Sequence, residues 1–318
     1  MKLTHNFLIL PNQQLDVREI LLDAGKREDE VTQTITTTGI SKIRYAGGEL
    51  FTEFVFSGLA KITKEHANVL EGLEAIIVVS QSYDQRIPSV STRIQKLYNL
   101  SSETYCIDVM DGCAGYIKAL SLASMLKSNG IKKILIIAGD INSSMTTNAE
   151  LGTKVLFGDG ISVSILEADA NKLEAQIFND GDLGNVIFCD IKEKVMNMNG
   201  FEVFRFAKNV VPKLIKDYLK NSNSKIEDYD LVALHQASDL VVATICKMLK
   251  FDNKFNSNFA CGEIGNLGAG SIGAWLSQGK DLISKGDLSL LAVGFGSGLS
   301  WGTASLVVNL KHNEVIYV

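Results

Sequence analysis

The feature of this 318-residue sequence that most constrains its fold is an internal repeat of secondary-structure patterns. A buried strand, a helix, a second strand, a glycine-rich turn and a third strand follow one another within residues 75–166, and the same order returns within residues 231–310. The two turns also share a local pattern, because residues 157–160 read Phe-Gly-Asp-Gly and residues 295–298 read Phe-Gly-Ser-Gly. The repeat predicts an α/β protein built from two similar halves.

Hydrophobic periodicity places the individual elements. Continuous apolar runs predict strands that are buried on both faces, and apolar residues at helical spacing predict helices between them. The predicted strands are residues 75–79, 134–138, 161–166, 231–234, 288–293 and 304–310, and the predicted helices are residues 114–128, 201–219, 238–249 and 271–284. Polar residues at 167–172 divide the chain into halves 1–167 and 168–318, and residues 179–199 are predicted as loop or edge structure.

Composition and charge exclude several classes of function. Hydrophobic residues make up 46% of the chain and charged residues 21%, which is typical of a globular protein without long disordered stretches. A net charge of -5 without a basic tail argues against a nucleic acid partner. With no signal-like N-terminus and no apolar run of about 18 residues, we expect no membrane partner and a cytoplasmic location. Five widely spaced cysteines without a C-x-x-C pair predict neither disulfides nor a metal site.

Cys113 has the sequence setting of a reactive thiol. It follows a predicted strand end and directly precedes the predicted helix 114–128, so we expect it at a helix N-terminus. Unpaired N–H groups and the helix dipole at that position favour the thiolate, which is the nucleophilic form. Gly112 and Gly115 would let a bulky substrate approach closely. A reactive nucleophile and a buried small apolar side chain both fit this local pattern, and the other four cysteines fit only the second.

One histidine and one asparagine suit a partner role for this thiol. His235 follows the predicted strand 231–234, and strand ends in α/β sheets are where functional sites assemble. Asn266 lies in a glycine-rich turn, where its amide could donate to a thioester carbonyl oxygen or simply form the turn. The remaining histidines, His5, His66 and His312, are predicted at the surface or in the polar C-terminal tail.

Together these segments resemble the β-ketoacyl-acyl-carrier-protein synthase III family of the thiolase superfamily, over residues 38–308. The matched motifs, in order, are residues 108–115, 157–160, 198–204, 235–237, 265–266 and 295–302. Several motifs in the same order are more specific than any one of them. The resemblance implies a thiolase fold, in which two duplicated αβαβα halves pack as a five-layer core.

The resemblance also implies an acyl-thioester transferase that catalyses a decarboxylative Claisen condensation. Cys113 would attack an acyl thioester and hold the acyl group, while His235 and Asn266 bind the carbonyl oxygen of an incoming malonyl-carrier-protein thioester. The backbone N–H groups of Cys113 and Ser297 would form the oxyanion hole. A thiol, an imidazole and an amide suffice for these steps, so no cofactor is expected.

The chain departs from the family where the family recognises coenzyme A. Gln33 and Thr37 stand in place of a tryptophan and an arginine, and Leu151 and Leu240 each replace an arginine. These losses weaken adenine stacking and phosphate pairing, which favours an acyl carrier protein over coenzyme A as the donor. Such a partner is acidic and fits a basic patch, although charged residues are also typical of a solvated helix face. The candidate patch consists of Lys247, Lys250, Lys254, Arg205 and Lys208.

Two other functions stay open. The thiol could pass its acyl group to an alcohol or amine in a glycan or secondary-metabolite pathway, or the chain could be a non-catalytic partner subunit of a heterodimer. The presence of Cys113 argues against the second. Hydroxymethylglutaryl synthase chemistry is disfavoured, because Gln81 occupies the place of the acidic catalyst in that related family. The same resemblance predicts a homodimer in which Ile87 enters the partner's acyl tunnel.

Overall fold

The strands and helices are defined in a computed structural model, which describes every residue except 191, 252–258, 280–281 and 283–284. The long sheet is made of β1 (Lys2–Leu10), β4 (Ala75–Val79), β5 (Tyr105–Val109), β6 (Lys133–Asp140), β7 (Gly160–Glu167), β8 (Glu174–Asn179), β11 (Leu231–Leu234), β12 (Leu288–Gly296) and β13 (Ser300–Tyr317). Two short ribbons pair β2 (Gln14–Asp16) with β3 (Lys42–Arg44) and β9 (Ile187–Cys189) with β10 (Met196–Met198). The helices are α1 (Val17–Asp23), α2 (Glu28–Thr38), α3 (Phe51–Glu65), α4 (Val90–Leu97), α5 (Gly115–Ser128), α6 (Leu151–Lys154), α7 (Gly200–Asn221), α8 (Asp239–Leu249) and α9 (Ser271–Ser277).

The nine-stranded sheet contains two four-strand units, or half-sheets, with the same strand order, and β5 extends the first unit at its edge. The order β4-β6-β7-β1 in one half matches β11-β12-β13-β8 in the other. In each half the first pairing is parallel and the next two are antiparallel. The repeat predicted from the sequence is therefore present in the topology. The exact boundary at residue 167 stays a prediction, and residue 167 is the last residue of β7.

The two halves are joined where β13 runs alongside β1. The first part of β13 pairs with β12 and β8, and its last part pairs in parallel with β1 as far as Tyr317 opposite Leu10. The prediction of a polar tail after residue 310 is wrong, because the tail continues the strand. Its polar side chains find buried partners: the Asn6 amide nitrogen donates to the Asn313 amide oxygen at 2.8 Å.

The position of His5 in β1 shows that a second expectation was wrong. His5, which we expected at the surface, is 7% exposed, since it lies in β1 between β13 and β7. The predicted helix 271–284 is also too long: α9 ends at Ser277, and part of the remainder lies outside the described residues.

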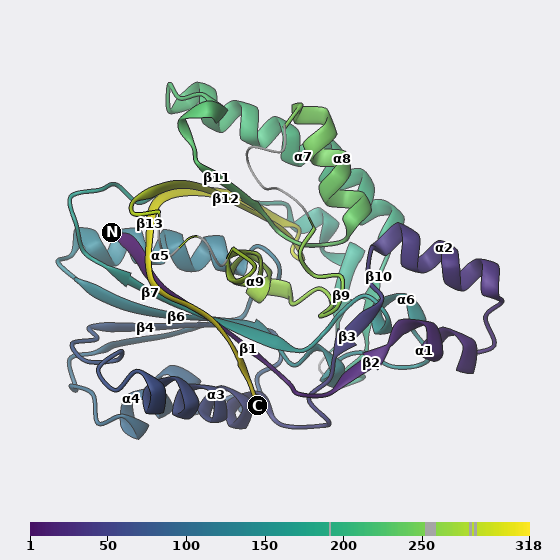
Figure 1. Ribbon diagram of the computed structural model, residues 1–318, viewed down its shortest axis with the longest axis horizontal. Helices are drawn as coiled ribbons and strands as arrows, with labels where there is room; N and C mark the ends of the chain where they lie inside the picture. The colour runs from purple at the N-terminus through teal and green to yellow at the C-terminus, as the bar shows by residue number, and fades with distance from the viewer. Residues whose placement is uncertain (191, 252–258, 280–281, 283–284) are drawn as a thin grey trace.

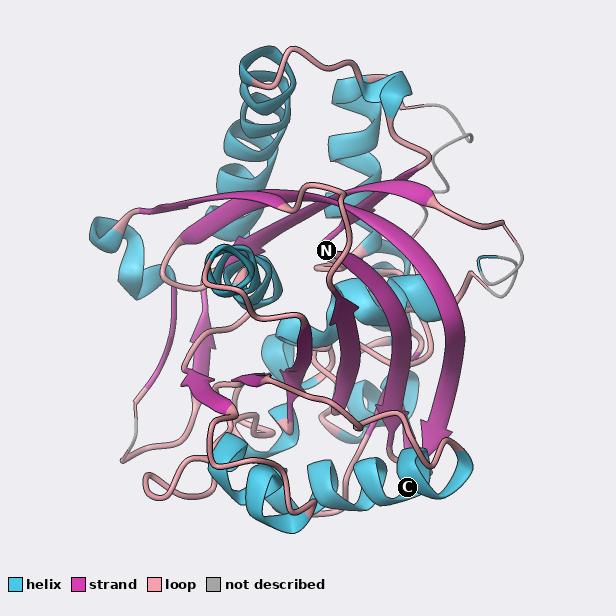
Figure 2. Ribbon diagram, turned by 90° about the vertical axis from the view of Figure 1, so that its left-hand side faces the viewer, coloured by secondary structure: helices cyan, strands magenta, loops and turns pink. Residues whose placement is uncertain are grey.

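Helices and half-sheets alternate in five layers, which confirms the predicted architecture. Helices α3 and α4 cover the outer face of the first half-sheet, and α7 and α8 cover the outer face of the second (Figures 1 and 2). Helices α5 and α9 lie in the middle layer, in contact with strands of both halves. The strand β4 is buried along its whole length because helices cover both of its faces. Within the described residues, no helix combines the length and apolar composition needed to cross a membrane.

The packing of α3 on the sheet depends on a glycine. A Cβ atom at Gly58 would lie 2.7 Å from Cγ2 of Ile9, a fully buried residue of β1. We therefore expect Gly58→Ala to lower the free energy of unfolding by about 1–3 kcal/mol through overpacking, measured by urea denaturation.

Gly152→Ala in α6 is the matched control. No atom lies within 4 Å of a Cβ at Gly152, so the better helix propensity of alanine should raise stability by up to about 1 kcal/mol or leave it unchanged. Equal effects of the two substitutions would contradict the close packing of α3 on β1.

Candidate active site

Cys113 lies in the turn between β5 and α5, at the edge of the middle layer. Gly115 opens the helix, its N–H donating to the carbonyl of Gly112 at 2.7 Å, and Cys113 stands one residue before the N-cap. The cysteine is 8% exposed and rests on the end of β12: a Cβ atom at Gly296 would lie 3.0 Å from its Sγ. Only glycine at position 296 leaves room for the thiol.

His235 reaches the same strand end from β11. Its backbone N–H donates to the carbonyl of Val293 at 2.8 Å, which extends the pairing of β11 with β12. Its ring packs edge-on against Phe295, with ring centroids 5.2 Å apart. Because Phe295 and Gly296 are consecutive, the structure brings His235 and Cys113 to neighbouring residues at the end of one strand.

The first residue of α9 holds the ring of His235. The hydroxyl of Ser271 lies 2.7 Å from Nδ1 of His235 and accepts the backbone N–H of Gln236 at 3.3 Å. In the tautomer in which this hydroxyl donates to Nδ1, the ring hydrogen is on Nε2, which can then donate to a ligand. Burial lowers the pKa of His235 to about 3, so the ring is neutral near pH 7.

Asn266 is held by a turn from the other half of the chain. Its backbone N–H donates to the carbonyl of Leu156 at 2.9 Å, and its carbonyl accepts the N–H of Gly158 at 3.1 Å. Its side-chain oxygen accepts the N–H of Gly268 at 2.9 Å, and its amide NH2 makes no hydrogen bond to any described residue. This arrangement leaves the two amide hydrogens available to a ligand. The motif at residues 157–160, noted in the sequence, therefore serves to hold Asn266.

The pKa of Cys113 differs from the sequence-based expectation, which favoured the thiolate. Burial, with a smaller contribution from the carboxylates of Asp140 and Asp111, raises the pKa of the thiol to about 12. Hydrogen bonds from the backbone N–H groups of Cys113 and Ser297 oppose this shift but do not overcome it. The expectation overlooked desolvation, which outweighs the helix end. The same two N–H groups are those assigned to the oxyanion hole, and that role stays a prediction.

A buried carboxylate that was not predicted from the sequence lies next to the site. Asp140 ends β6, and its Oδ1 accepts hydrogen bonds from the Ser80 hydroxyl and from the backbone N–H groups of Gln81 and Ser82, at 2.6–3.0 Å. Burial raises its pKa. An acidic residue at the end of a predicted strand was the available signal. Gln81, which stands where the related family has its acidic catalyst, donates from its amide to the hydroxyl of Ser297 at 3.3 Å.

The remaining predicted residues lie away from the thiol. Ile87, between β4 and α4, is 84% exposed. The basic residues lie on α7 and at the end of α8, two helices that pack against each other. Arg205 is already paired with Glu202, and Lys254 lies outside the described residues.

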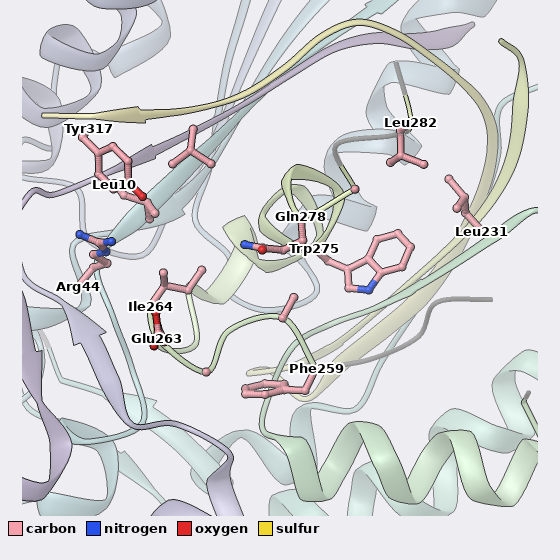
Figure 3. A pocket seen from close by; sticks show the side chains of 14 residues that line it. Leu10, Arg44, Leu231, Phe259, Glu263, Ile264, Trp275, Gln278, Leu282 and Tyr317 are labelled. Carbon is pink, nitrogen blue, oxygen red and sulfur yellow. The ribbon is translucent and has the colours of Figure 1, made fainter. Parts of the chain in front are cut away.

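A cavity of about 570 Å³ opens beside the glycine-rich turn but is distinct from the thiol site. Trp275 of α9, Gln278 just after that helix and Phe259 of the preceding loop lie near its centre, with Arg44 and Leu10 at one end (Figure 3). None of Cys113, His235 and Asn266 lines it. The cavity therefore does not explain where an acyl chain would lie.

The segments that form the site match known families. The model described as 3-Oxoacyl-[acyl-carrier-protein (ACP)] synthase III matches residues 107–181, and its C-terminal counterpart matches residues 219–308. The chain is 31% identical over 302 residues to a protein of Clostridium tetani named Beta-ketoacyl-[acyl-carrier-protein] synthase III, covering 86% of this chain and 88% of that protein. A protein of the same name from Acholeplasma laidlawii is 30% identical over 293 residues, covering 90% and 93%.

Solved structures confirm the thiolase fold. A 3-oxoacyl-(acyl-carrier protein) synthase from Burkholderia xenovorans superimposes with a TM-score of 0.89 at 24% identity, covering 100% of this chain and 97% of that one. A 3-oxoacyl-[acyl-carrier-protein] synthase III from Aquifex aeolicus gives a TM-score of 0.85 at 24% identity, covering 96% and 98%.

The raised pKa of Cys113 predicts an alkaline reactivity profile. Below its pKa the thiolate fraction grows tenfold per pH unit, so iodoacetamide should alkylate Cys113 about tenfold faster at each unit from pH 7 to 10. The rate is measured by intact mass, with Cys113→Ala to assign the adduct. A plateau below pH 9 would instead show that the helix end stabilises the thiolate.

Proposed function

Because the chain belongs to the 3-oxoacyl-[acyl-carrier-protein] synthase III family, we propose that it condenses an acyl group held on Cys113 with a malonyl thioester, with loss of carbon dioxide. The observation that supports the proposal is that the buried thiol of Cys113 and the neutral imidazole of His235 lie at the same end of β12, while Asn266, in the turn before α9, keeps an unused amide NH2. The relatives are named synthases, so neither transfer to an alcohol or amine nor a non-catalytic subunit is favoured.

The first step loads the enzyme. The Cys113 sulfur attacks the carbonyl carbon of the acyl thioester, the carrier's sulfur leaves, and the thiol proton leaves with the carrier's thiol. Negative charge on the carbonyl oxygen is stabilised by the backbone N–H groups of Cys113 and Ser297, which already point at the sulfur.

The second step forms the carbon–carbon bond. The thioester carbonyl of the malonyl group accepts hydrogen bonds from Nε2 of His235 and the amide of Asn266, and these bonds strengthen as carbon dioxide departs and an enolate forms. The enolate carbon attacks the acyl carbonyl on Cys113. The thiolate leaves and takes a proton from water, and the β-ketoacyl thioester is released.

The condensation is tested with acyl donors and a malonyl carrier-protein thioester, by measuring carbon dioxide release and the mass of the product. We expect a β-ketoacyl product that is abolished by Cys113→Ala and lowered roughly 10²-fold or more by His235→Ala or Asn266→Ala, since each removes a donor to developing charge. Cys189→Ala, at an exposed cysteine, is the matched control and should keep full activity. An ester or amide product without carbon dioxide would contradict condensation.

The proposed donor is an acyl carrier protein thioester. Gln33 and Thr37 are exposed on α2, and Leu240 is 43% exposed on α8, which contacts α2. None of these side chains can stack on adenine as an indole does or pair with a phosphate as a guanidinium does.

Kinetics with matched donors test this preference. We expect kcat/KM at least about tenfold higher for an acyl group on the carrier protein than on coenzyme A. Lys247→Glu should raise KM for the carrier-protein donor roughly fivefold by repelling an acidic partner, whereas Lys64→Glu on α3 should not. A higher kcat/KM for the coenzyme A donor would refute the preference.

A homodimer is also part of the proposal. The edge strand β5 and its surroundings expose large apolar side chains: Tyr105 is 54%, Met110 73% and Ile87 84% exposed. A second copy would cover them. A cytoplasmic location likewise stays a prediction.

Sedimentation equilibrium tests the dimer. The wild-type chain should sediment as a dimer and Tyr105→Asp as a monomer, because a charge at the edge strand opposes burial. Met248→Asp, at an exposed apolar residue of α8, should leave the dimer intact. Ile87→Trp should keep the dimer but shorten the acyl chain that is accepted. A monomeric wild type would contradict both.

A further inference from the structure

Three of the four histidines of the chain gather on the outer side of the first half, away from Cys113. His312 and Glu314 are two residues apart in β13, so their side chains project from the same face of that strand. His66 caps the C-terminal end of α3, which packs on β13, and Figure 1 shows the end of β13 beside this helix. His5 lies opposite His312 on the neighbouring strand β1.

The carboxylate of Glu314 lies between two imidazoles. Its Oε2 is 3.2 Å from Nε2 of His66, and its Oε1 is 3.4 Å from Nδ1 of His312. One ligand atom from each of the three residues lies within 4.8 Å of the others. Tetrahedral zinc with bonds of about 2.05 Å separates its ligand atoms by about 3.3 Å, and each imidazole nitrogen lies at about this distance from one oxygen of the carboxylate, Oε2 for His66 and Oε1 for His312.

We propose that His66, His312 and Glu314 bind a zinc ion, with water as the fourth ligand. Two imidazoles and one carboxylate are a ligand set that zinc uses, and the imidazoles favour zinc over calcium or magnesium. The metal bonds would form from Nε2 of His66, Nδ1 of His312 and the carboxylate of Glu314, whose two oxygens each face one imidazole.

Ring packing holds both imidazoles, and a cavity gives access to them. The fully buried ring of Phe7 packs 5.4 Å from that of His66, and the ring of His5 stacks 5.3 Å from that of His312. A cavity of about 370 Å³ opens at the cluster and is lined by His5, His66 and His312. Both lysines at this cavity have partners: Lys311 is paired with Glu167 at 2.9 Å, and Lys133 donates to the backbone carbonyl of Glu71 at 2.7 Å.

The function of this site is structural. A metal ion here would tie the end of α3 to the last strand of the chain, two elements that are 248 residues apart at the contact between His66 and Glu314. It would stabilise the outer layer of the first half and leave the thiol chemistry unchanged, because none of its three residues contacts Cys113 or His235.

Zinc binding is measured by calorimetry on tag-free, chelator-treated protein, together with the melting temperature and the visible spectrum of the cobalt-substituted protein. We expect one zinc per chain, a melting temperature roughly 3 °C or more higher at saturating zinc, and a cobalt spectrum without sulfur charge-transfer bands. His66→Gln, His312→Ala and Glu314→Gln should each weaken binding at least about tenfold.

Matched controls separate this site from the others on the chain. Glu167→Gln removes a carboxylate at the same cavity and should change the zinc affinity less than twofold or so. Cys189→Ser removes an exposed thiol and should have no effect. The site is refuted if zinc does not bind, if binding survives the His66, His312 and Glu314 substitutions, or if it is lost with Cys189→Ser. Any of these would leave a carboxylate hydrogen-bonded to two imidazoles without a metal.

Discussion

Close packing of α5 and α9 between the two half-sheets is the constraint on which the rest of the structure depends. Both helices approach the strands through small residues: a Cβ at Gly270 would lie 2.9 Å from the carbonyl oxygen of Ala138, and a Cβ at Gly294 would lie 3.2 Å from Cα of Ala114. Each helix also begins at the functional site. Helix α5 starts just after Cys113, and α9 starts at Ser271, which orients His235. The packing that builds the core therefore also sets the positions of the thiol and the imidazole.

The sequence predicted best those elements that are buried on both sides. Continuous apolar runs located β4 and β11 to the residue, and helical spacing located α5 and α8 within one residue. It missed β1, because that strand contains Thr4, His5 and Asn6, whose polarity hides a buried strand. These residues are tolerated because Thr4 and Asn6 find hydrogen-bond partners on distant segments, which no local pattern reveals, and because Nδ1 of His5 is hydrogen-bonded to the hydroxyl of Thr4.

The sequence indicated which residues form the candidate site, but it did not indicate their pKa values. Strand ends and a helix start, together with ordered motifs, pointed to Cys113, His235 and Asn266. The pKa of the thiol could not be predicted, since it depends on burial under β12 and on the carboxylate of Asp140. Ser271 was missed for a related reason, because its contact with His235 joins segments 36 residues apart. The cluster of His66, His312 and Glu314 depends on an even longer separation and has no signature in sequence spacing.

The contact between Ser271 and His235 also bears on which way the proposed chemistry can run. An imidazole that accepts the Ser271 hydroxyl at Nδ1 donates from Nε2 and can stabilise an enolate, but it then has no free lone pair with which to remove a proton from a methyl thioester. The carbanion must then arise by decarboxylation of the malonyl thioester, which releases carbon dioxide. A condensation that begins with the loss of carbon dioxide cannot readily be reversed by accumulating product, so the proposed chemistry commits each acyl chain to elongation.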